Sequence, residues 1–276
     1  IDCIALYGTI FGVATSIGLS VSIMNAAVEP LTGLSFDLYN QIIIVILVCL
    51  LGIISAISGV NRGIRRISEL NIWLSLMLLL TFLAVGPVAE IIVNLLSTLI
   101  AYFLAVLPMG FWIGSSADEQ SWQASWTVFY WGWWFAWTPF VALFVARISR
   151  GRTIREFIIG VLLVPTLVII LWMSVFGGTA IHQELNESGL ISSPVNLDYS
   201  LGLIASIHAL NLGEMKTILF MVVTFLLFTW LITSLDSATL VICNILDVSQ
   251  STLMKIIWGF VLGTVSCTLM LVGGIE

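Results

Sequence analysis

Residues 126–157, WTVFYWGWWFAWTPFVALFVARISRGRTIREF, decide the fold of this chain. An apolar run containing six tryptophans and tyrosines is followed directly by four arginines. Such a run is typical of a membrane-spanning helix whose last turn reaches the cytoplasmic surface. Aromatic faces bind desolvated cations, and quaternary ammonium groups are the best-known examples. The pattern therefore predicts a membrane helix that binds a solute with such a headgroup.

Composition places the rest of the chain in the membrane as well. Hydrophobic residues make up 60% of the 276 residues and charged residues 9%, against roughly 25% charged residues in a soluble domain. Apolar runs long enough to cross the hydrocarbon core as helices are found at Ile4–Ala27, Gln41–Gly59, Leu70–Gly86, Gln123–Ala146, Phe157–Phe176, Thr217–Ile245 and Leu253–Val272. They do not alternate in polarity as barrel strands do. We expect an all-α integral membrane protein with about seven transmembrane helices, forming a single domain over residues 1–276.

The charged residues predict the orientation of these helices. Eight of the nine lysines and arginines lie in alternate connections, namely Arg62, Arg65, Arg66, Arg147, Arg150, Arg152, Arg155 and Lys255. The other connections are acidic, and Lys216 is their only cation. The positive-inside rule puts the basic connections in the cytoplasm and the acidic ones outside. The net charge of -6 therefore reflects external connections and not a nucleic-acid partner.

Two segments between the runs have distinct compositions. Residues 87–110 mix apolar side chains with polar ones after Pro87, which favours an amphipathic helix on the outer surface over another crossing. Residues 177–216 are polar and rich in Gly, Pro, Asn and Ser, which predicts an extracellular loop long enough to act as a gate.

Part of the aromatic cluster lies too deep in the bilayer to belong to the belt of aromatic residues at the membrane–water interface. Trp137 lies ten residues before Arg147, about 15 Å along a helix, which is close to the bilayer centre. Tyr130, Trp134 and Trp137 follow i, i+4, i+7 spacing and share a face, with Trp133 beside them. We interpret these four side chains as a binding cluster, with packing against neighbouring helices as the alternative.

Pro139 predicts an interruption in the same helix. A proline inside a helix removes one backbone hydrogen bond and frees a carbonyl, and Gly132 and Thr138 lie close by. Interrupted helices near the bilayer centre are where transporters bind their solutes.

The other chemistry-bearing residues give weaker patterns. Thr233 and Ser234 offer neighbouring hydroxyl oxygens to a hard cation, although each hydroxyl can instead bond back to its own helix. Asp236 is costly to bury and is expected to pair with an arginine or to line a water path. The four cysteines and two histidines show neither zinc-ligand nor disulfide spacing, so no cofactor is expected. Without paired acids or a nucleophile with a base, no enzyme is indicated.

The longest motifs resemble the betaine/choline/carnitine transporter family. The resemblance rests on WTVFYWGWW, WTPF and ARISRGRTIREF, and it extends through VLLVPTLVIILWMSVFGGTAI, ITSLDSAT and ISGVNRGIRRISELN. It implies twelve spans with a LeuT-type core of two inverted repeats. This chain would be an internal fragment running from about the fifth span to the eleventh, and the family implies a homo-trimer.

The resemblance also implies roles for particular residues. Trp133, Trp134 and Trp137 match the aromatic cage that holds a trimethylammonium group. Thr233 and Ser234 match hydroxyl ligands of a sodium site whose other ligands come from outside this chain. In addition, Thr9 and Phe140 match part of a second sodium site, where Val13 replaces the family's second threonine.

Taken together, these observations favour a secondary transporter in a bacterial or archaeal cell membrane. Its solute would be glycine betaine, choline, carnitine or a similar compound, with sodium as the coupling ion. Proton-coupled choline uptake and sodium-independent exchange are alternatives within this class. An ion channel is the alternative from another class, although it would need more polar or charged rings along a pore.

Overall fold

The computed structural model describes residues 2–58, 64–249 and 251–272, and within these ranges it contains helices and no strands. The long helices are α1 (Asp2–Thr32), α2 (Leu38–Ser58), α3 (Ile64–Val85), α4 (Val88–Gly110), α6 (Phe129–Ile148), α8 (Val164–Asn186), α11 (Met215–Ile245) and α12 (Thr252–Val272). The short helices are α5 (Ala117–Gln123), α7 (Ile154–Ile158), α9 (Ser192–Leu197) and α10 (Gly202–Ala209). The prediction of an all-α fold is confirmed.

Two π-helical turns join short helices to long ones. The turn Ala124–Val128 connects α5 to α6, and the turn Ile159–Leu163 connects α7 to α8. Each joined helix is therefore long and apolar enough to cross a membrane, over Ala117–Ile148 and Ile154–Asn186.

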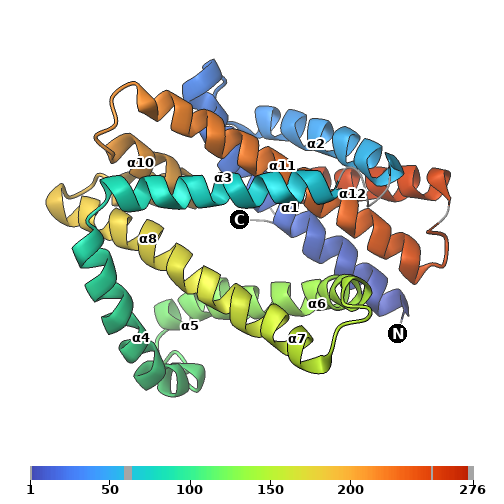
Figure 1. The fold of residues 1–276 in the computed structure, drawn as a ribbon, viewed down its shortest axis with the longest axis horizontal. Helices are drawn as coiled ribbons and strands as arrows, with labels where there is room; N and C mark the ends of the chain where they lie inside the picture. Colours follow the sequence, from blue (N-terminus) through green and yellow to red (C-terminus); the bar gives the residue numbers. More distant parts are fainter. Residues whose placement is uncertain (1, 59–63, 250, 273–276) are drawn as a thin grey trace.

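Helices α1 and α11 form the centre of the structure (Figure 1). Val13, Ile17 and Val21 of α1 are almost completely buried, as are Leu235 and Ile242 of α11. Helix α1 packs against α6, α11 and α12, and α11 also packs against α2 and α3. By contrast, α4, α6 and α8 carry many exposed apolar side chains, as expected of helices in contact with lipid or with further membrane helices.

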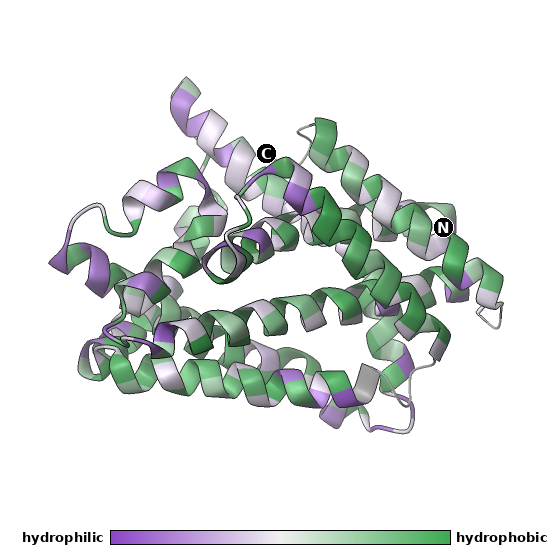
Figure 2. Cartoon of the chain, turned by 90° about the horizontal axis from the view of Figure 1, so that it is seen from above, coloured by the Kyte–Doolittle hydropathy of each residue, from purple (hydrophilic) through white to green (hydrophobic). Residues whose placement is uncertain are grey.

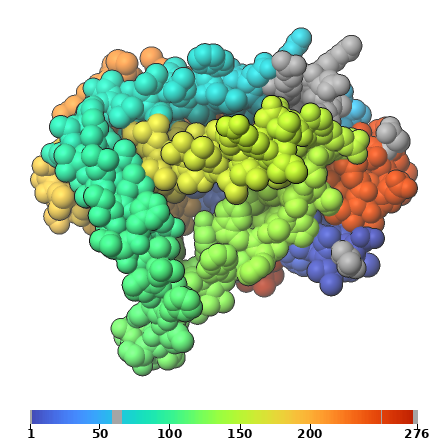
Figure 3. All heavy atoms as spheres, turned by 60° about the horizontal axis from the view of Figure 1, so that its bottom comes forward, coloured from blue at the N-terminus to red at the C-terminus, as the bar shows by residue number. Residues whose placement is uncertain are grey.

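Most long helices run along one common direction, and α4 is the exception. Figure 1 shows α4 leaving the end of α3 and running across the others, and in the space-filling view of Figure 3 its far end stands out from the body. Eight helices in the described ranges are long and apolar enough to span a membrane, and α4 is the one that the sequence assigned to the outer surface. That external position remains a prediction, and the transverse direction of α4 is consistent with it.

The described helix ends separate the charged residues into two groups as the sequence predicted, and Arg62 lies outside the described residues. The α6–α7 connection, with its arginines, and the start of α12, with Lys255, lie at one end of the helices. The α3–α4 turn and the segment between α8 and α11 lie at the opposite end. Figure 2 shows hydrophilic residues gathered near helix ends and connections, while the middles of the helices are mostly hydrophobic.

The segment expected as a loop, residues 177–216, is largely helical. Helix α8 continues to Asn186, and α9, a 3-10 turn at Tyr199–Leu201 and α10 follow. The Glu184 carboxylate accepts hydrogen bonds from the backbone N–H groups of Gly189, Ile191 and Ser192, which orders the turn after α8. The loop prediction missed this because it counted polar and turn-forming residues and not the hydrogen bonds that they make.

Candidate functional site

The four aromatic residues singled out in the sequence form one contiguous cluster on α6. The ring centroids of Trp134 and Trp137 are 5.3 Å apart at an interplanar angle of 83°, and those of Trp133 and Trp137 are 6.4 Å apart. The Tyr130 ring lies 6.0 Å from Trp133 and 6.1 Å from Trp134. Phe140 extends the cluster, with its ring 5.7 Å from Trp137. The structure therefore brings the predicted binding residues together on one face.

This cluster is held against α1 by very close helix packing. A Cβ added at Gly12 would lie 3.0 Å from the Trp137 backbone nitrogen, and one at Gly8 would lie 3.1 Å from the Ala136 carbonyl oxygen. Because only glycine leaves this space free, the two helices touch through their backbones. The Trp133 indole N–H bridges the same contact by donating to the Gly12 carbonyl oxygen and to the Ser16 hydroxyl, both at 3.2 Å.

Helix α6 is not interrupted at Pro139, contrary to the sequence-based expectation. It continues from Phe129 to Ile148 with Pro139 inside it. The irregular backbone lies earlier, in the π-helical turn Ala124–Val128, which joins α6 at the end of the aromatic cluster. Such turns are frequent at functional sites.

Thr9 and Phe140 lie on the two helices that meet through Gly8 and Gly12. Both side chains are buried, Thr9 completely. The Thr9 hydroxyl oxygen is buried and has no hydrogen-bond partner among the described residues, which is unusual because buried hydroxyl groups are nearly always paired.

Thr233 and Ser234 lie in the second half of α11 and differ in their surroundings. The Thr233 hydroxyl donates to carbonyl oxygens of its own helix, Thr229 at 3.0 Å and Trp230 at 2.9 Å. Ser234 is exposed on the surface of this chain. The back-bond considered from the sequence is therefore present at Thr233, but it uses only the hydroxyl proton and leaves the oxygen lone pairs available.

Asn71 is a buried polar residue that the sequence analysis missed. Its Oδ1 atom is placed 2.6 Å from the Thr229 hydroxyl oxygen, one helical turn before Thr233. That hydroxyl also lies within hydrogen-bond distance of two carbonyl groups of α11, and its single proton cannot serve all three acceptors. Exchanging the amide nitrogen and oxygen of Asn71 lets it donate to Thr229 instead. An asparagine one residue after the predicted start of an apolar helix at Leu70 has no sequence pattern that would have revealed this contact.

Asp236 pairs with a serine and not with an arginine of the described residues. Ser55 of α2 donates a short hydrogen bond to Asp236 Oδ2, and Asp236 Oδ1 is buried with no hydrogen-bond partner in the part of the chain that the structure describes. The expected arginine pairing is therefore not observed within residues 2–58, 64–249 and 251–272.

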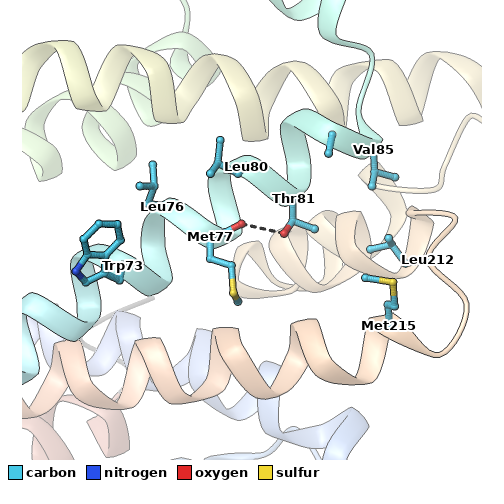
Figure 4. Close-up of a pocket in the computed structure, with 9 residues that line it drawn as sticks. Trp73, Leu76, Met77, Leu80, Thr81, Val85, Leu212 and Met215 are labelled. Atoms are coloured by element: carbon cyan, nitrogen blue, oxygen red, sulfur yellow. Dashed lines mark hydrogen bonds between the residues drawn. The ribbon is translucent and has the colours of Figure 1, made fainter.

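A groove between α3 and the start of α11 is lined by apolar side chains, unlike the polar sites described above (Figure 4). It has a volume of about 460 Å³ and is lined by Trp73, Leu76, Met77, Leu80, Thr81, Ala84, Val85, Leu212 and Met215. The Thr81 hydroxyl donates to the Met77 carbonyl oxygen, so the lining is almost entirely apolar. Such a surface suits a hydrophobic helix or an acyl chain better than a charged solute.

Comparison with known proteins identifies the family of this chain. The family model described as BCCT, betaine/carnitine/choline family transporter, matches residues 1–276. The chain is 37% identical to glycine betaine transporter 1 of Vibrio parahaemolyticus over 279 residues, covering 100% of the chain and 52% of that protein. It is 35% identical over 280 residues to a glycine betaine/proline/choline transporter of the same organism, covering 100% of the chain and 49% of that protein. It is 34% identical to the glycine betaine transporter OpuD of Bacillus subtilis over 279 residues, covering 100% of the chain and 53% of that protein.

The chain therefore spans about half the length of the curated relatives that it matches. Those relatives carry the names of transporters and not of enzymes. A multi-pass helical chain matched over its whole length by the family model belongs to the betaine/carnitine/choline transporter family.

Proposed function

We propose that this chain is the central part of a secondary transporter that imports a quaternary-ammonium compatible solute across a bacterial cell membrane, driven by sodium. The observation that carries the proposal is the aromatic cluster of α6. Each of its four rings lies against two or more of the others, and the backbone of α6 packs directly against that of α1. A quaternary ammonium group makes no hydrogen bonds, so its recognition depends on ring faces of this kind.

The four rings of the cluster have different roles in the proposed binding site. Trp133 uses its indole N–H on α1, so its plane is fixed by the α1–α6 contact. Trp134 and Trp137 meet edge to face, and Trp134 is more than one third exposed on this chain. We assign the direct contact with the headgroup to Trp134 and Trp137, and the support of their geometry to Trp133 and Tyr130.

Glycine betaine is the favoured solute. It occurs in the names of the three relatives compared above, whereas choline and proline occur in one of them. Proline has no quaternary nitrogen, so a relative that transports it must recognise more than a trimethylammonium group. Recognition of the solute carboxylate would involve residues beyond this chain.

The residues present fit a sodium ion at the α11 site. Sodium prefers hydroxyl and carbonyl oxygens, and the lone pairs of Thr233 and Ser234 are available to it. The ion would hold α11 against a neighbouring helix when bound, so that ion binding and solute binding assist each other. At the second site the buried oxygen of Thr9, which no described residue partners, also fits a cation, although Val13 contributes no oxygen there.

The proposal is tested with the full-length parent protein in proteoliposomes. Uptake of radiolabelled glycine betaine, choline and carnitine is measured with a sodium gradient, with potassium in place of sodium, and with a proton gradient alone. We expect sodium-dependent uptake of glycine betaine. Uptake driven by protons alone, or exchange without any ion gradient, would replace sodium coupling with one of the two alternatives. Conduction of ions without solute would indicate a channel.

The sodium ligands are tested with Thr233→Ala and Ser234→Ala combined. We expect a higher sodium concentration for half-maximal uptake, with solute affinity recovering at saturating sodium. Thr264→Ala is the matched control, because Thr264 on α12 is exposed and donates to the carbonyl of its own helix at 2.8 Å in the same way. An unchanged sodium dependence in the double variant would contradict the assignment of this site.

A further inference from the structure

We propose that the apolar groove between α3 and the start of α11 holds one acyl chain of an outer-leaflet phospholipid with a phosphoethanolamine headgroup. No residue of the aromatic cluster lines this groove, so lipid binding there is separate from solute binding. The length and width of the groove favour such a chain, and two charged residues at its outer end favour such a headgroup.

The groove is about as long as one leaflet of a bilayer. Trp73 lies at one end, and Val85, Leu212 and Met215 lie at the other (Figure 4). Val85 comes twelve residues after Trp73, a rise of about 18 Å, and half of the hydrocarbon core is about 15 Å thick. Trp73 is nine residues after Ile64, the first residue of α3, or about 14 Å from the inner end of the helix. The groove therefore runs from near the bilayer centre to the outer surface.

The width of the groove suits a hydrocarbon chain better than a helix. Its volume of about 460 Å³, spread over about 18 Å, gives a mean cross-section of about 26 Å². A helix with its side chains is about 10 to 12 Å wide, which corresponds to about 80 Å² or more. An acyl chain is a single row of carbon atoms that pack about 4 Å from their neighbours, so one such chain fits.

The lining side chains can adapt to a lipid chain. Met77 and Met215 are unbranched and flexible, and methionine fills irregular apolar gaps well. The Thr81 hydroxyl already donates its proton to the Met77 carbonyl oxygen at 2.8 Å. A lipid chain that displaces water from the groove therefore leaves no unpaired donor behind at Thr81.

Two charged residues flank Met215 at the outer end of the groove. Glu214 precedes it and Lys216 follows it, and within the described part of the chain neither has an ion-pair partner. The Lys216 ammonium group uses one of its three N–H donors on the His208 carbonyl oxygen, at 2.6 Å. A phosphoethanolamine headgroup carries the complementary charges, with an anionic phosphate for Lys216 and ammonium N–H donors for Glu214.

The same two charges disfavour other common headgroups. The quaternary ammonium group of phosphatidylcholine has no N–H to donate to Glu214. Phosphatidylglycerol has no cationic group, so Glu214 repels its phosphate without any compensating attraction. We therefore expect phosphatidylethanolamine to bind most tightly of the three lipids.

The experiment measures lipid binding by native mass spectrometry of the full-length parent protein, purified in detergent and stripped of lipid. The three lipids carry identical acyl chains, and the buffer contains neither solute nor sodium. Lys216→Gln should weaken the binding of all three, because each has a phosphate. Glu214→Gln should weaken phosphatidylethanolamine and strengthen phosphatidylglycerol. We expect each change to be about threefold to fivefold, as for an exposed ion pair.

Glu187→Gln is the matched control for charge. Glu187 is an exposed acid on the same external side but does not line the groove. Its replacement should leave the order of the three lipids unchanged. Equal binding of the three lipids by the wild-type protein would overturn the assignment of the headgroup.

Ala84→Trp tests the groove itself. Ala84 lines the groove and is exposed, so a larger side chain there fills the groove without entering the core. We expect the affinity for phosphatidylethanolamine to fall on the order of tenfold, because several methylene groups of the lipid lose their contacts. Ala101→Trp is the matched control, since Ala101 is an exposed alanine of α4 outside the groove.

A second measurement needs no variant. Phosphatidylethanolamine carrying a light-activated diazirine is cross-linked to the wild-type protein in proteoliposomes, and the labelled peptides are sequenced. A diazirine at the end of the acyl chain should label Trp73 or Met77, and one next to the glycerol should label Val85 or Met215. Labels only at other sites, or unchanged binding in Ala84→Trp, would overturn the lipid site and indicate that another helix of the parent protein or a second copy covers the groove. Such results would leave the proposed sodium-driven uptake intact, because lipid binding is measured without solute or sodium.

Discussion

The Trp133 indole nitrogen lies 3.2 Å from the Gly12 carbonyl oxygen and donates a hydrogen bond to it, joining α6 to α1 at the helix contact beneath the aromatic cluster. An indole N–H in a membrane interior needs such a partner, because no lipid atom of the hydrocarbon core can accept its proton. The bond orients one ring of the cluster and thereby limits where its neighbours Trp134 and Trp137 can lie.

The first prediction concerns the solute headgroup. Trp137→Leu and Trp134→Leu in the full-length protein should each weaken glycine betaine binding by about 1 to 2 kcal/mol, the range for a desolvated cation–π contact. Apparent affinity from uptake kinetics measures the loss. Trp131→Leu is the control, since Trp131 is 59% exposed and contacts Phe135 on another face of α6. Equal affinities in all three variants would refute the cage assignment.

The second prediction concerns the α1–α6 contact. Gly12→Ala places a methyl group 3.0 Å from the Trp137 backbone nitrogen, so the helices must separate. We expect a loss of stability of about 1 to 3 kcal/mol, as for other overpacked sites, together with weaker solute binding. Gly132→Ala is the matched control because a Cβ there meets no atom within 4 Å. Thermal unfolding measures the stability of both variants, and equal unfolding temperatures would contradict the prediction.

The third prediction concerns the orientation of the helices. In a protein with Cys3 replaced by serine, a cysteine at Ser149 should react with impermeant thiol reagents only from the cytoplasmic side. A cysteine at Ser193, which is exposed on α9, should react only from outside. Opposite labelling would reverse the topology inferred from the arginine-rich connections.

The fourth prediction concerns the pH dependence of stability through His208. Partial burial, and then the charge of Lys216, lower the pKa of the His208 imidazole below its ordinary value of 6.5. The native state therefore binds its proton less readily than the unfolded state, and stability should fall as the pH drops below about 6.5. The His208→Gln variant should lose this part of the pH dependence. A parallel decline in unfolding temperature for both proteins between pH 8 and pH 5 would contradict the prediction.

The sequence by itself determined the helical membrane fold, the separation of charge and the composition of the aromatic cluster. These properties are local or additive: apolar length sets the number of long helices, arginine position sets their ends, and the spacing of Tyr130, Trp134 and Trp137 puts them on one helix face. The family resemblance came from the same uninterrupted motifs, and the family match over residues 1–276 confirms it.

Only the tertiary structure decided which polar groups meet. The sequence predicted a break at Pro139, whereas α6 continues through it. For Asp236 the sequence offered an arginine partner or a water path, and the structure pairs it with Ser55, 181 residues away in sequence. Likewise, no local pattern connects Asn71 to Thr229 or Trp133 to Gly12. Hydrogen bonds between helices depend on the rotation and separation of each helix. These follow from how all the helices pack together, so no single segment can specify them.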